Sequence, residues 1–590
     1  MMIPRPEHPR PDFERMNWIN LNGEWQFEID NSKSGLEKGW RCGRDFSRRI
    51  IVPFPPESRL SGVEEKDFME SIWYRRFFNV PEKWFDGKIL LHFGAVDYKA
   101  TVWINGNKAG SHKGGYTPFT FDITKLVKPK DNELVVWVVD ECRSGLQPTG
   151  KQSHRLKSYS CLYTRVTGIW QTVWLENVPQ QYIKFFHITT NPYEGEVFIS
   201  VHLEGVRSEY VLAAYAYDEE SLVAEGKTKS LNPVSLIHLK IPNPHLWSPE
   251  DPYLYKLVLK LTPQAGSIDE VNSYFGLREI RRVGNKILLN NQVRFLRLVL
   301  DQGYYPDGIY TAPSDEALKR DIELAKDMGF DGARLHQKVF EPRFLYWADK
   351  LGYLVASEFP DWGADLTNPS TRDAVLDEWI EAVRRDINHP CIIIWTPFNE
   401  RFIHVNDEDC IEFIRRVTRI TKLIDPTRLV IDCSGWTHVD EEIDIYDVHD
   451  YEQNPEIFKS HYVNLKNQIP FDFRPPNFFL RNIPYRNQPF MVSEYGGIWW
   501  NPPGLEVGGS WGYGEKPKTL EEFIARYRAL TESLLSNRGV SGFCYTQLYD
   551  IEQETNGLYT YNRKPKVDPK IILSINRQKA AIENEPFNVE

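Results

Sequence analysis

The amino-acid sequence predicts two β-sandwiches followed by a (β/α)8 barrel, and three observations lead to this fold class. The chain has 590 residues, which is too long for one hydrophobic core and indicates three or more domains. Short alternating runs typical of β-strands fill the amino-terminal part. Beyond Gly276, apolar runs of strand length alternate with helical segments instead, which is the pattern of a βα repeat.

The first sandwich is expected over residues 1–180. Strand-like runs at 73–78, 100–104 and 133–139 are separated by turn residues, and their regular spacing is typical of packed antiparallel sheets. The second sandwich is expected over residues 181–276, with strand-like runs at 197–203 and 253–259. Its length suits a small immunoglobulin-like domain.

The barrel is expected over residues 277–590. Eight candidate strands occupy residues 294–300, 332–335, 353–357, 391–396, 429–433, 445–449, 489–493 and 542–546. Helical segments are expected at 315–328, 343–351, 372–388, 408–424 and 520–535. Eight repeats in about 300 residues match a (β/α)8 barrel. Since no low-complexity linker interrupts the chain, we expect the domains to pack tightly.

The composition is that of an ordinary soluble globular protein, with 41% hydrophobic and 26% charged residues. Aromatic residues reach 13%, which suits flat platforms for sugars, although β-rich folds favour aromatic residues as well. The net charge of −11, without a long basic run, argues against nucleic acid as a partner.

Targeting and cysteine signals are also weak. No apolar stretch of about 18 residues and no signal-peptide core occurs, so we expect no membrane partner and a cytoplasmic location. The seven cysteines are odd in number and never spaced as CxxC, which indicates neither a disulfide framework nor a zinc knuckle.

Two carboxylates stand at the ends of predicted barrel strands, where barrel enzymes carry their active sites. Glu400 follows the fourth strand and Glu494 follows the seventh. Retaining cleavage of a glycosidic bond needs two carboxyl groups about 5 to 5.5 Å apart. One carboxylate at a strand end is as often a salt-bridge partner or a helix cap, but two in matching positions favour this chemistry.

These segments resemble motifs of glycoside hydrolase family 2, the β-galactosidase, β-glucuronidase and β-mannosidase group. Residues 394–400, IWTPFNE, resemble its acid/base motif Trp-x-x-x-Asn-Glu, and residues 493–496, SEYG, resemble its nucleophile motif. Residues 94–97, 103–106 and 168–170 resemble its sugar-binding sandwich. The resemblance covers essentially the whole chain and implies a jelly roll, an immunoglobulin-like domain and a catalytic TIM barrel.

The resemblance also implies an exo-acting, retaining reaction by double displacement. Glu494 would be the ionised nucleophile and Glu400 the general acid and then base, while Asn399 would bind the sugar 2-hydroxyl. No cofactor and no metal at the active site are expected, while a structural divalent cation of the kind found in some family members stays open. The expected partner is a carbohydrate substrate, and self-association into a homo-oligomer stays open.

Other strand ends supply candidate sugar-binding residues: Asp301, Arg334, His336, Glu358, His449, Tyr451, Trp362, Trp436 and Trp499. Arg334 resembles the family's barrel arginine, which holds the nucleophile, but the family's Arg-x-x-His appears here as Arg334-Leu335-His336. Tyr451 could donate a hydrogen bond to Glu494, although packing is slightly favoured. Asp301 could cap a turn instead of binding sugar.

A loop of the jelly roll departs from the family pattern. Long members carry an acidic residue six positions before a Gly-Ile pair, where this chain has Leu162. Gln147, Lys151 and Gln152 lie nearby and could substitute, but we expect a solvated loop.

The glycon is predicted to be neutral, most simply β-galactose. Family β-glucuronidases carry Asn-x-Lys in the loop after the eighth strand, whereas Asn556 is followed by Leu558 here, and Lys564 lies too far along the chain. A β-glucuronidase or β-galacturonidase is the alternative within the family.

Two alternatives come from other classes. A non-catalytic carbohydrate-binding protein is disfavoured because both carboxylates are retained. A metallohydrolase is disfavoured because no HExxH motif occurs and His336 and His449 are isolated in sequence.

Overall fold

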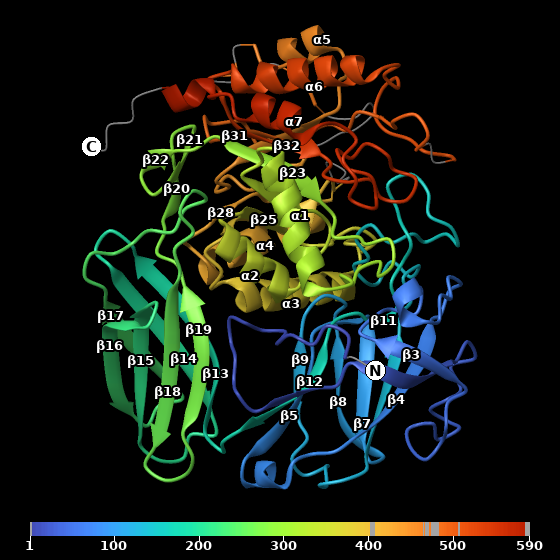
Figure 1. The fold of residues 1–590 in the computed structure, drawn as a ribbon, viewed down its shortest axis with the longest axis vertical. Helices are drawn as coiled ribbons and strands as arrows, with labels where there is room; N and C mark the ends of the chain where they lie inside the picture. The colour runs from blue at the N-terminus through green and yellow to red at the C-terminus, as the bar shows by residue number, and fades with distance from the viewer. Residues whose placement is uncertain are drawn as a thin grey trace.

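The computed structural model describes residues 3–401, 407–463, 465, 471–473, 483–505 and 508–584. The chain forms two β-sandwich domains and a barrel, which confirms the predicted fold class. In Figure 1 the two sandwiches stand beside each other and the barrel lies across one end of both.

The first domain is a jelly roll of two antiparallel sheets with strand orders β1-β12-β5-β9 and β3-β2-β4-β10-β7-β8. Leu134, Val136 and Val138 alternate along β10 and point into the core between the sheets. Its strands are β1 (Trp18–Asn20), β2 (Gly23–Ile29), β3 (Arg48–Val52), β4 (Ser71–Phe78), β5 (Lys88–Phe93), β6 (Val96–Asp97), β7 (Lys99–Ile104), β8 (Asn107–Lys113), β9 (Phe119–Asp122), β10 (Asn132–Val139), β11 (Gly168–Ile169) and β12 (Val173–Val178).

The second domain is an immunoglobulin-like sandwich with strand orders β13-β14-β17 and β16-β15-β18-β19. Along β18, Leu257, Leu259 and Leu261 are buried in its core, while the residues between them are more exposed. Its strands are β13 (Tyr182–Asn191), β14 (Glu196–Glu204), β15 (Tyr210–Asp218), β16 (Ser221–Ser230), β17 (Val234–Lys240), β18 (Tyr255–Pro263) and β19 (Asp269–Phe275).

A small antiparallel sheet leads into the barrel and contains β20 (Ile280–Val283), β21 (Lys286–Leu289) and β22 (Gln292–Val293). The barrel strands then follow one another around a parallel sheet, and the first pairs with the eighth. They are β23 (Leu296–Asp301), β24 (Gly332–Leu335), β25 (Leu354–Glu358), β26 (Ile392–Thr396), β28 (Leu429–Val430), β30 (Tyr446–Asp450), β31 (Phe490–Gly496) and β32 (Val540–Thr546).

Helices on the outside of the barrel begin at well-defined caps. Ser314 accepts a hydrogen bond from the backbone of Ala317, and Pro369 occupies the first turn of its helix, where its missing N–H costs nothing. The helices are α1 (Asp315–Asp327), α2 (Pro342–Leu351), α3 (Pro369–Asp386), α4 (Glu408–Ile424), α5 (Pro455–Ser460), α6 (Leu520–Leu535) and α7 (Pro569–Asn576).

The fifth barrel strand differs from the prediction, which placed one strand at 429–433. The structure contains β28 and a separate short strand, β29 (Cys433–Ser434). The Asp432 carboxylate accepts hydrogen bonds from the backbone N–H groups of Cys433, Val439 and Asp440, and these bonds turn the chain. β29 pairs with β27 (Phe398–Asn399), so the extra strand supports the residues just before Glu400.

The jelly roll packs directly on the barrel. Tyr116, Tyr163 and Trp170 of the first domain belong to the same buried core as the barrel strands. Arg15 in the amino-terminal segment bonds Glu176 of the jelly roll and Asp269 of the second sandwich, each at 2.8 Å. The jelly roll is therefore packed against the barrel and tied to the second sandwich through Arg15.

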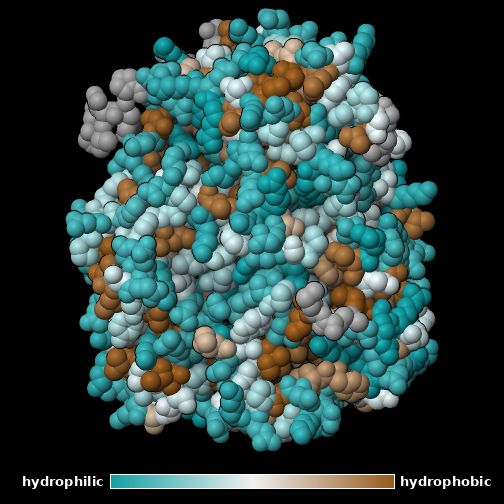
Figure 2. Space-filling model, in the orientation of Figure 1, coloured by the Kyte–Doolittle hydropathy of each residue, from teal (hydrophilic) through white to brown (hydrophobic). Residues whose placement is uncertain are grey.

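Figure 2 shows that hydrophobic side chains on this face lie in small groups among hydrophilic ones. Within the described residues, no helix is both long enough and apolar enough to cross a membrane.

Candidate active site

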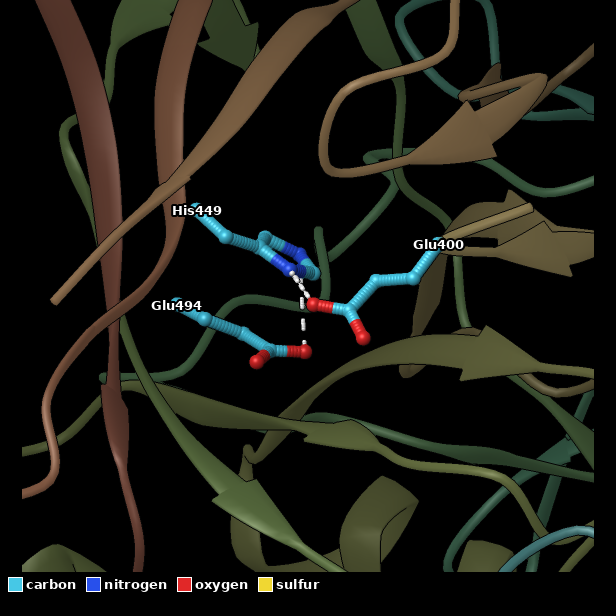
Figure 3. Close-up of side chains that lie close together, drawn as sticks. All are labelled: Glu400, His449 and Glu494. Atoms are coloured by element: carbon cyan, nitrogen blue, oxygen red, sulfur yellow. Dashed lines mark hydrogen bonds and ion pairs between the residues drawn. The ribbon is translucent and has the colours of Figure 1, made fainter. Parts of the chain in front are cut away.

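Glu400 and Glu494 lie together at the mouth of the barrel (Figure 3). Glu400 directly follows β27 and its φ is 48°, a left-handed conformation that is uncommon outside glycine and turns its side chain inward. Glu494 lies within β31. One oxygen from each carboxylate and one ring nitrogen of His449 all lie within 4.8 Å of one another. The two predicted catalytic carboxylates therefore share one site.

Arg334, at the end of β24, holds this site together. Its guanidinium is buried and donates to Glu494 Oε1 at 2.8 Å, to Glu358 Oε2 at 2.7 Å and to Asn399 Oδ1 at 2.6 Å. A planar guanidinium can hold several oxygens in fixed directions. One residue thus orients the nucleophile candidate and the amide beside the acid/base candidate.

Positive groups keep Glu494 ionised. Burial alone would raise the pKa of Glu494, but the charges of His449 and Arg334 hold it far below its ordinary value. Tyr451 also donates to Glu494 Oε2 at 2.5 Å, and its ring stacks on Tyr513 with 3.5 Å between ring centroids. Tyr451 therefore serves both for hydrogen bonding and for packing, whereas the sequence slightly favoured packing alone.

His449, on β30, bridges the two carboxylates. Its Nδ1 lies 2.6 Å from Glu400 Oε1 and its Nε2 lies 3.4 Å from Glu494 Oε1. Burial opposes a charge on the ring, but the two glutamates raise the pKa of His449 above its ordinary value. A protonated ring can donate to both carboxylates at once.

Glu358 and His336 complete the buried side of the site. Glu358 accepts from Arg334 and from the backbone of Gln337, so both of its oxygens are already bonded. His336 Nδ1 lies 3.0 Å from Glu358 and 4.0 Å from Glu494. The structure thus gives Glu358 the role of holding Arg334, and its contact with the sugar stays a prediction.

Asp301 accepts from the Tyr549 hydroxyl at 2.5 Å and from the backbone N–H of Gly303 at 2.9 Å. The second bond is the turn cap that the sequence left open. Burial raises the pKa of Asp301 to about 6, and a sugar contact stays a prediction here too.

The three candidate tryptophans, Trp362, Trp436 and Trp499, are half-buried. Trp362 donates from its indole to the backbone carbonyl of Asn399 at 3.1 Å. The Trp436 ring meets His449 edge-on at 5.7 Å. Stacking of any of the three on a sugar stays a prediction.

The jelly-roll loop is more buried than the sequence predicted. Gln147, Lys151 and Gln152 are 3%, 7% and 1% exposed, so the expected solvated loop is in fact buried. The Lys151 ammonium lies 3.9 Å from the centre of the Trp362 ring. No local signal in the sequence marks this burial, because the covering surface comes from the barrel.

Glu554 and Asn556 were also missed as part of the site. Tyr163 of the jelly roll donates to Glu554 at 2.5 Å, and Asn556 donates to the same carboxylate at 2.9 Å. Gln302 connects Tyr163 to Gln547 in the same network. The Asn556-x-Leu558 loop therefore lies near the jelly roll, where it supplies amides but no cation.

Glu400, His449 and Glu494 also have the spacing of a metal site. The sequence did not indicate this grouping, because the two glutamates lie 49 and 45 positions from His449. Two carboxylates and one imidazole are a ligand set that Zn²⁺ accepts, provided that the ring is neutral.

A pair of carboxylates at the strand ends of a (β/α)8 barrel, next to a jelly roll, is typical of a glycoside hydrolase. Family models agree along the chain: the glycosyl hydrolases family 2 sugar binding domain matches residues 19–179, the central family 2 domain matches 181–278 and the family 2 TIM barrel domain matches 311–568. The chain belongs to glycosyl hydrolase family 2.

Relatives carry two activities. A β-galactosidase of Thermoanaerobacter pseudethanolicus is 26% identical over 70% of this chain and 54% of its own length. A β-glucuronidase of Paenibacillus borealis is 24% identical over 69% of this chain and 72% of its own. The chain thus spans about half of the first relative.

Solved structures of a β-glucuronidase from Ruminococcus gnavus share the fold. Its complex with D-glucuronic acid aligns with a TM-score of 0.78 at 22% identity, covering 97% of this chain and 99% of that one. The similarity extends across all three domains.

Proposed function

We propose that this chain is a retaining, exo-acting β-glycosidase that works by double displacement. The observation that carries the proposal is the spacing of the two carboxylates, whose nearest candidate oxygens lie within 4.8 Å. Retaining enzymes hold their carboxyl groups about 5 to 5.5 Å apart, whereas inverting enzymes need about 6.5 to 9.5 Å for a water molecule.

In the first step, Glu494 attacks the anomeric carbon while Glu400 protonates the departing oxygen. Arg334 and Tyr451 orient the nucleophile through hydrogen bonds to different oxygens of Glu494. Formation of the glycosyl ester removes the negative charge of Glu494. Glu400, now ionised, then activates a water molecule that releases the sugar.

Exo action is supported by the packing of the jelly-roll loop. Residues 149 and 150 donate hydrogen bonds to the barrel loop at residues 360 and 362, which closes one side of the site. A site that is closed beyond one sugar unit favours the release of terminal sugars.

Two classes of glycon are candidates. The sequence predicts β-galactose because the loop after the eighth strand lacks a cation, and Lys564, the other lysine considered, is exposed. A β-linked uronic acid is the second candidate, because the buried Lys151 brings a positive charge from the jelly roll. The relatives named above include both activities.

The direct test of the mechanism is the configuration of the first product. We expect ¹H NMR during hydrolysis of a nitrophenyl β-glycoside to reveal the β-anomer before mutarotation. An α-anomer as the first product would instead indicate inversion and refute the proposal.

A further inference from the structure

The jelly-roll loop of residues 149–152 is fixed to the barrel by its backbone. Thr149 N–H donates to the carbonyl of Trp362 at 2.7 Å, and the carbonyl of Lys151 accepts from Tyr163 N–H at 2.8 Å. Gly150 has φ +56°, and a Cβ there would lie 2.4 Å from the carbonyl oxygen of Gln337. Only glycine permits this close approach, so the loop holds Lys151 in a defined position against the barrel.

Lys151 is a buried cation that lies against an aromatic ring. Its ammonium lies over the Trp362 ring at 3.9 Å and its residue is 7% exposed. Within the described ranges, none of the carboxylates forms an ion pair with it. A buried charge that lacks a partner is costly, which makes the site receptive to an anion.

The charge of Lys151 acts on groups of the catalytic site. After burial, it is the largest influence that lowers the pKa of His336, and it also contributes to the low pKa of Glu494. Geometry agrees, because the Trp362 ring beneath the Lys151 ammonium donates to the carbonyl of Asn399, next to Glu400. Lys151 therefore lies close to the catalytic carboxylates.

The carboxylates around Lys151 have other partners. Glu494 is bonded by Arg334 and Tyr451, and Glu554 is bonded by Tyr163 and Asn556. Burial disfavours the charge on Lys151, but Cys161, Glu400, Glu494 and Glu554 raise its pKa. Both oxygens of Glu494 and of Glu554 are already bonded to other groups. A substrate anion would therefore complete the site.

We propose that Lys151 binds a carboxylate on the glycon and that β-linked uronic acids are the preferred substrates. This inference rests on the proposed glycosidase function. A hydroxyl of galactose could accept a hydrogen bond from Lys151 but would leave its charge unbalanced. The galactose prediction assumed that no cation reaches the pocket, which holds for the loop after the eighth strand but not for the jelly-roll loop.

The test compares kcat/KM on nitrophenyl β-glucuronide, β-galacturonide, β-galactoside and 6-sulfated β-galactoside. The wild-type enzyme should prefer one of the two uronides. Lys151→Met should lower the ratio of uronide to galactoside activity by about 10- to 100-fold, as expected for loss of one charge-assisted hydrogen bond. Lys151→Arg, which keeps the charge, should retain most of the ratio.

Lys157→Met is the matched control, because Lys157 lies in the same loop but is exposed. It should leave the ratio unchanged. Thermal melting of each variant checks folding, and Lys151→Gln supplies a second neutral variant if Lys151→Met is unstable.

The other possible results would each overturn a specific part of the proposal. A wild-type preference for the galactoside, or a ratio that Lys151→Met does not alter, overturns the role of Lys151 while leaving the glycosidase proposal intact. A preference for the 6-sulfated glycoside over both uronides overturns the carboxylate assignment. Hydrolysis of none of the glycosides, together with no covalent labelling of Glu494, would refute the proposed function itself.

Discussion

The two sides of the pocket balance their charges differently. On the catalytic side, Arg334 bonds Glu494, Glu358 and Asn399, so the charges are paired within the protein. On the jelly-roll side, Lys151 contacts the face of Trp362 and has no ion-pair partner among the described residues. Paired charges hold the catalytic side chains in position before the substrate binds. An unpaired charge contributes only when a substrate of opposite charge binds to it. Changes on the first side should therefore affect every substrate, and changes on the second should affect substrate choice.

The largest effect is expected for Glu494→Gln. The amide keeps the size of the side chain but cannot form the glycosyl ester, so kcat should fall by about 10⁴-fold or more on every glycoside. Steady-state kinetics on the nitrophenyl panel measure this loss, and a wild-type melting temperature would exclude unfolding. If kcat fell for only one class of glycon, the catalytic side would not act on all substrates alike, and the distinction between the two sides of the pocket would be wrong.

Glu400→Gln should have an effect that depends on the leaving group. A nitrophenol needs partial protonation and a simple alkyl alcohol needs more, so we expect losses of about 10²-fold and 10⁴-fold respectively. Comparing kcat/KM for nitrophenyl and methyl glycosides of the same sugar tests this. Equal losses on both would argue that Glu400 is not the general acid.

Arg334→Lys tests the catalytic side of the pocket, because it keeps the positive charge but removes the planar guanidinium that binds several oxygens at once. A lysine can reach only one of the three oxygens that Arg334 binds, so we expect kcat/KM to fall by about 10²-fold on uronides and galactosides alike. Arg320→Lys on the exposed face of α1 is the control and should have no effect. A change in glycon preference in Arg334→Lys would contradict this picture.

A smaller effect is expected from pH. The pKa of His449 is raised, so the ring keeps its proton to higher pH than an ordinary histidine and loses it as the pH rises through the shifted value. With a dinitrophenyl glycoside, whose leaving group needs no acid, the alkaline loss of activity should come from His449. We expect His449→Gln to remove this loss. If the pH–rate profile of His449→Gln keeps the same loss of activity at high pH, His449 is not the group that titrates.

No effect is expected from chelators. Although Glu400, His449 and Glu494 could bind a metal, their acid and nucleophile roles need none, so dialysis against EDTA should leave kcat/KM unchanged. Added Zn²⁺ should inhibit instead, by competing with the proton on His449. Activity that disappears with EDTA and returns with a metal would support the metallohydrolase alternative.

The barrel and its catalytic pair could be predicted because their signals are local. Apolar runs of strand length mark the strands, and Glu400 and Glu494 follow such runs directly or lie near their ends. The division of the fifth strand was missed because it depends on the Asp432 side chain, which bonds backbone groups several residues away.

The jelly-roll side of the pocket could not be predicted in the same way. Lys151 lies in a polar stretch that resembles a solvated loop, and only its packing on the barrel buries it. The bridge between His449 and Glu400 likewise joins residues 49 positions apart. Such contacts arise from tertiary packing between strand ends and between domains, which no short motif records.

The cytoplasmic location stays a prediction, and so does self-association into a homo-oligomer.

The most direct test of the account is covalent labelling of the nucleophile. A 2-deoxy-2-fluoro β-glycoside with a good leaving group should inactivate the enzyme and accumulate as a glycosyl ester. The fluorine slows both steps, whereas the good leaving group speeds only the first. Peptide mapping by mass spectrometry should locate the label on Glu494. Recovery of the label on another residue, such as Glu358, would contradict the assignment.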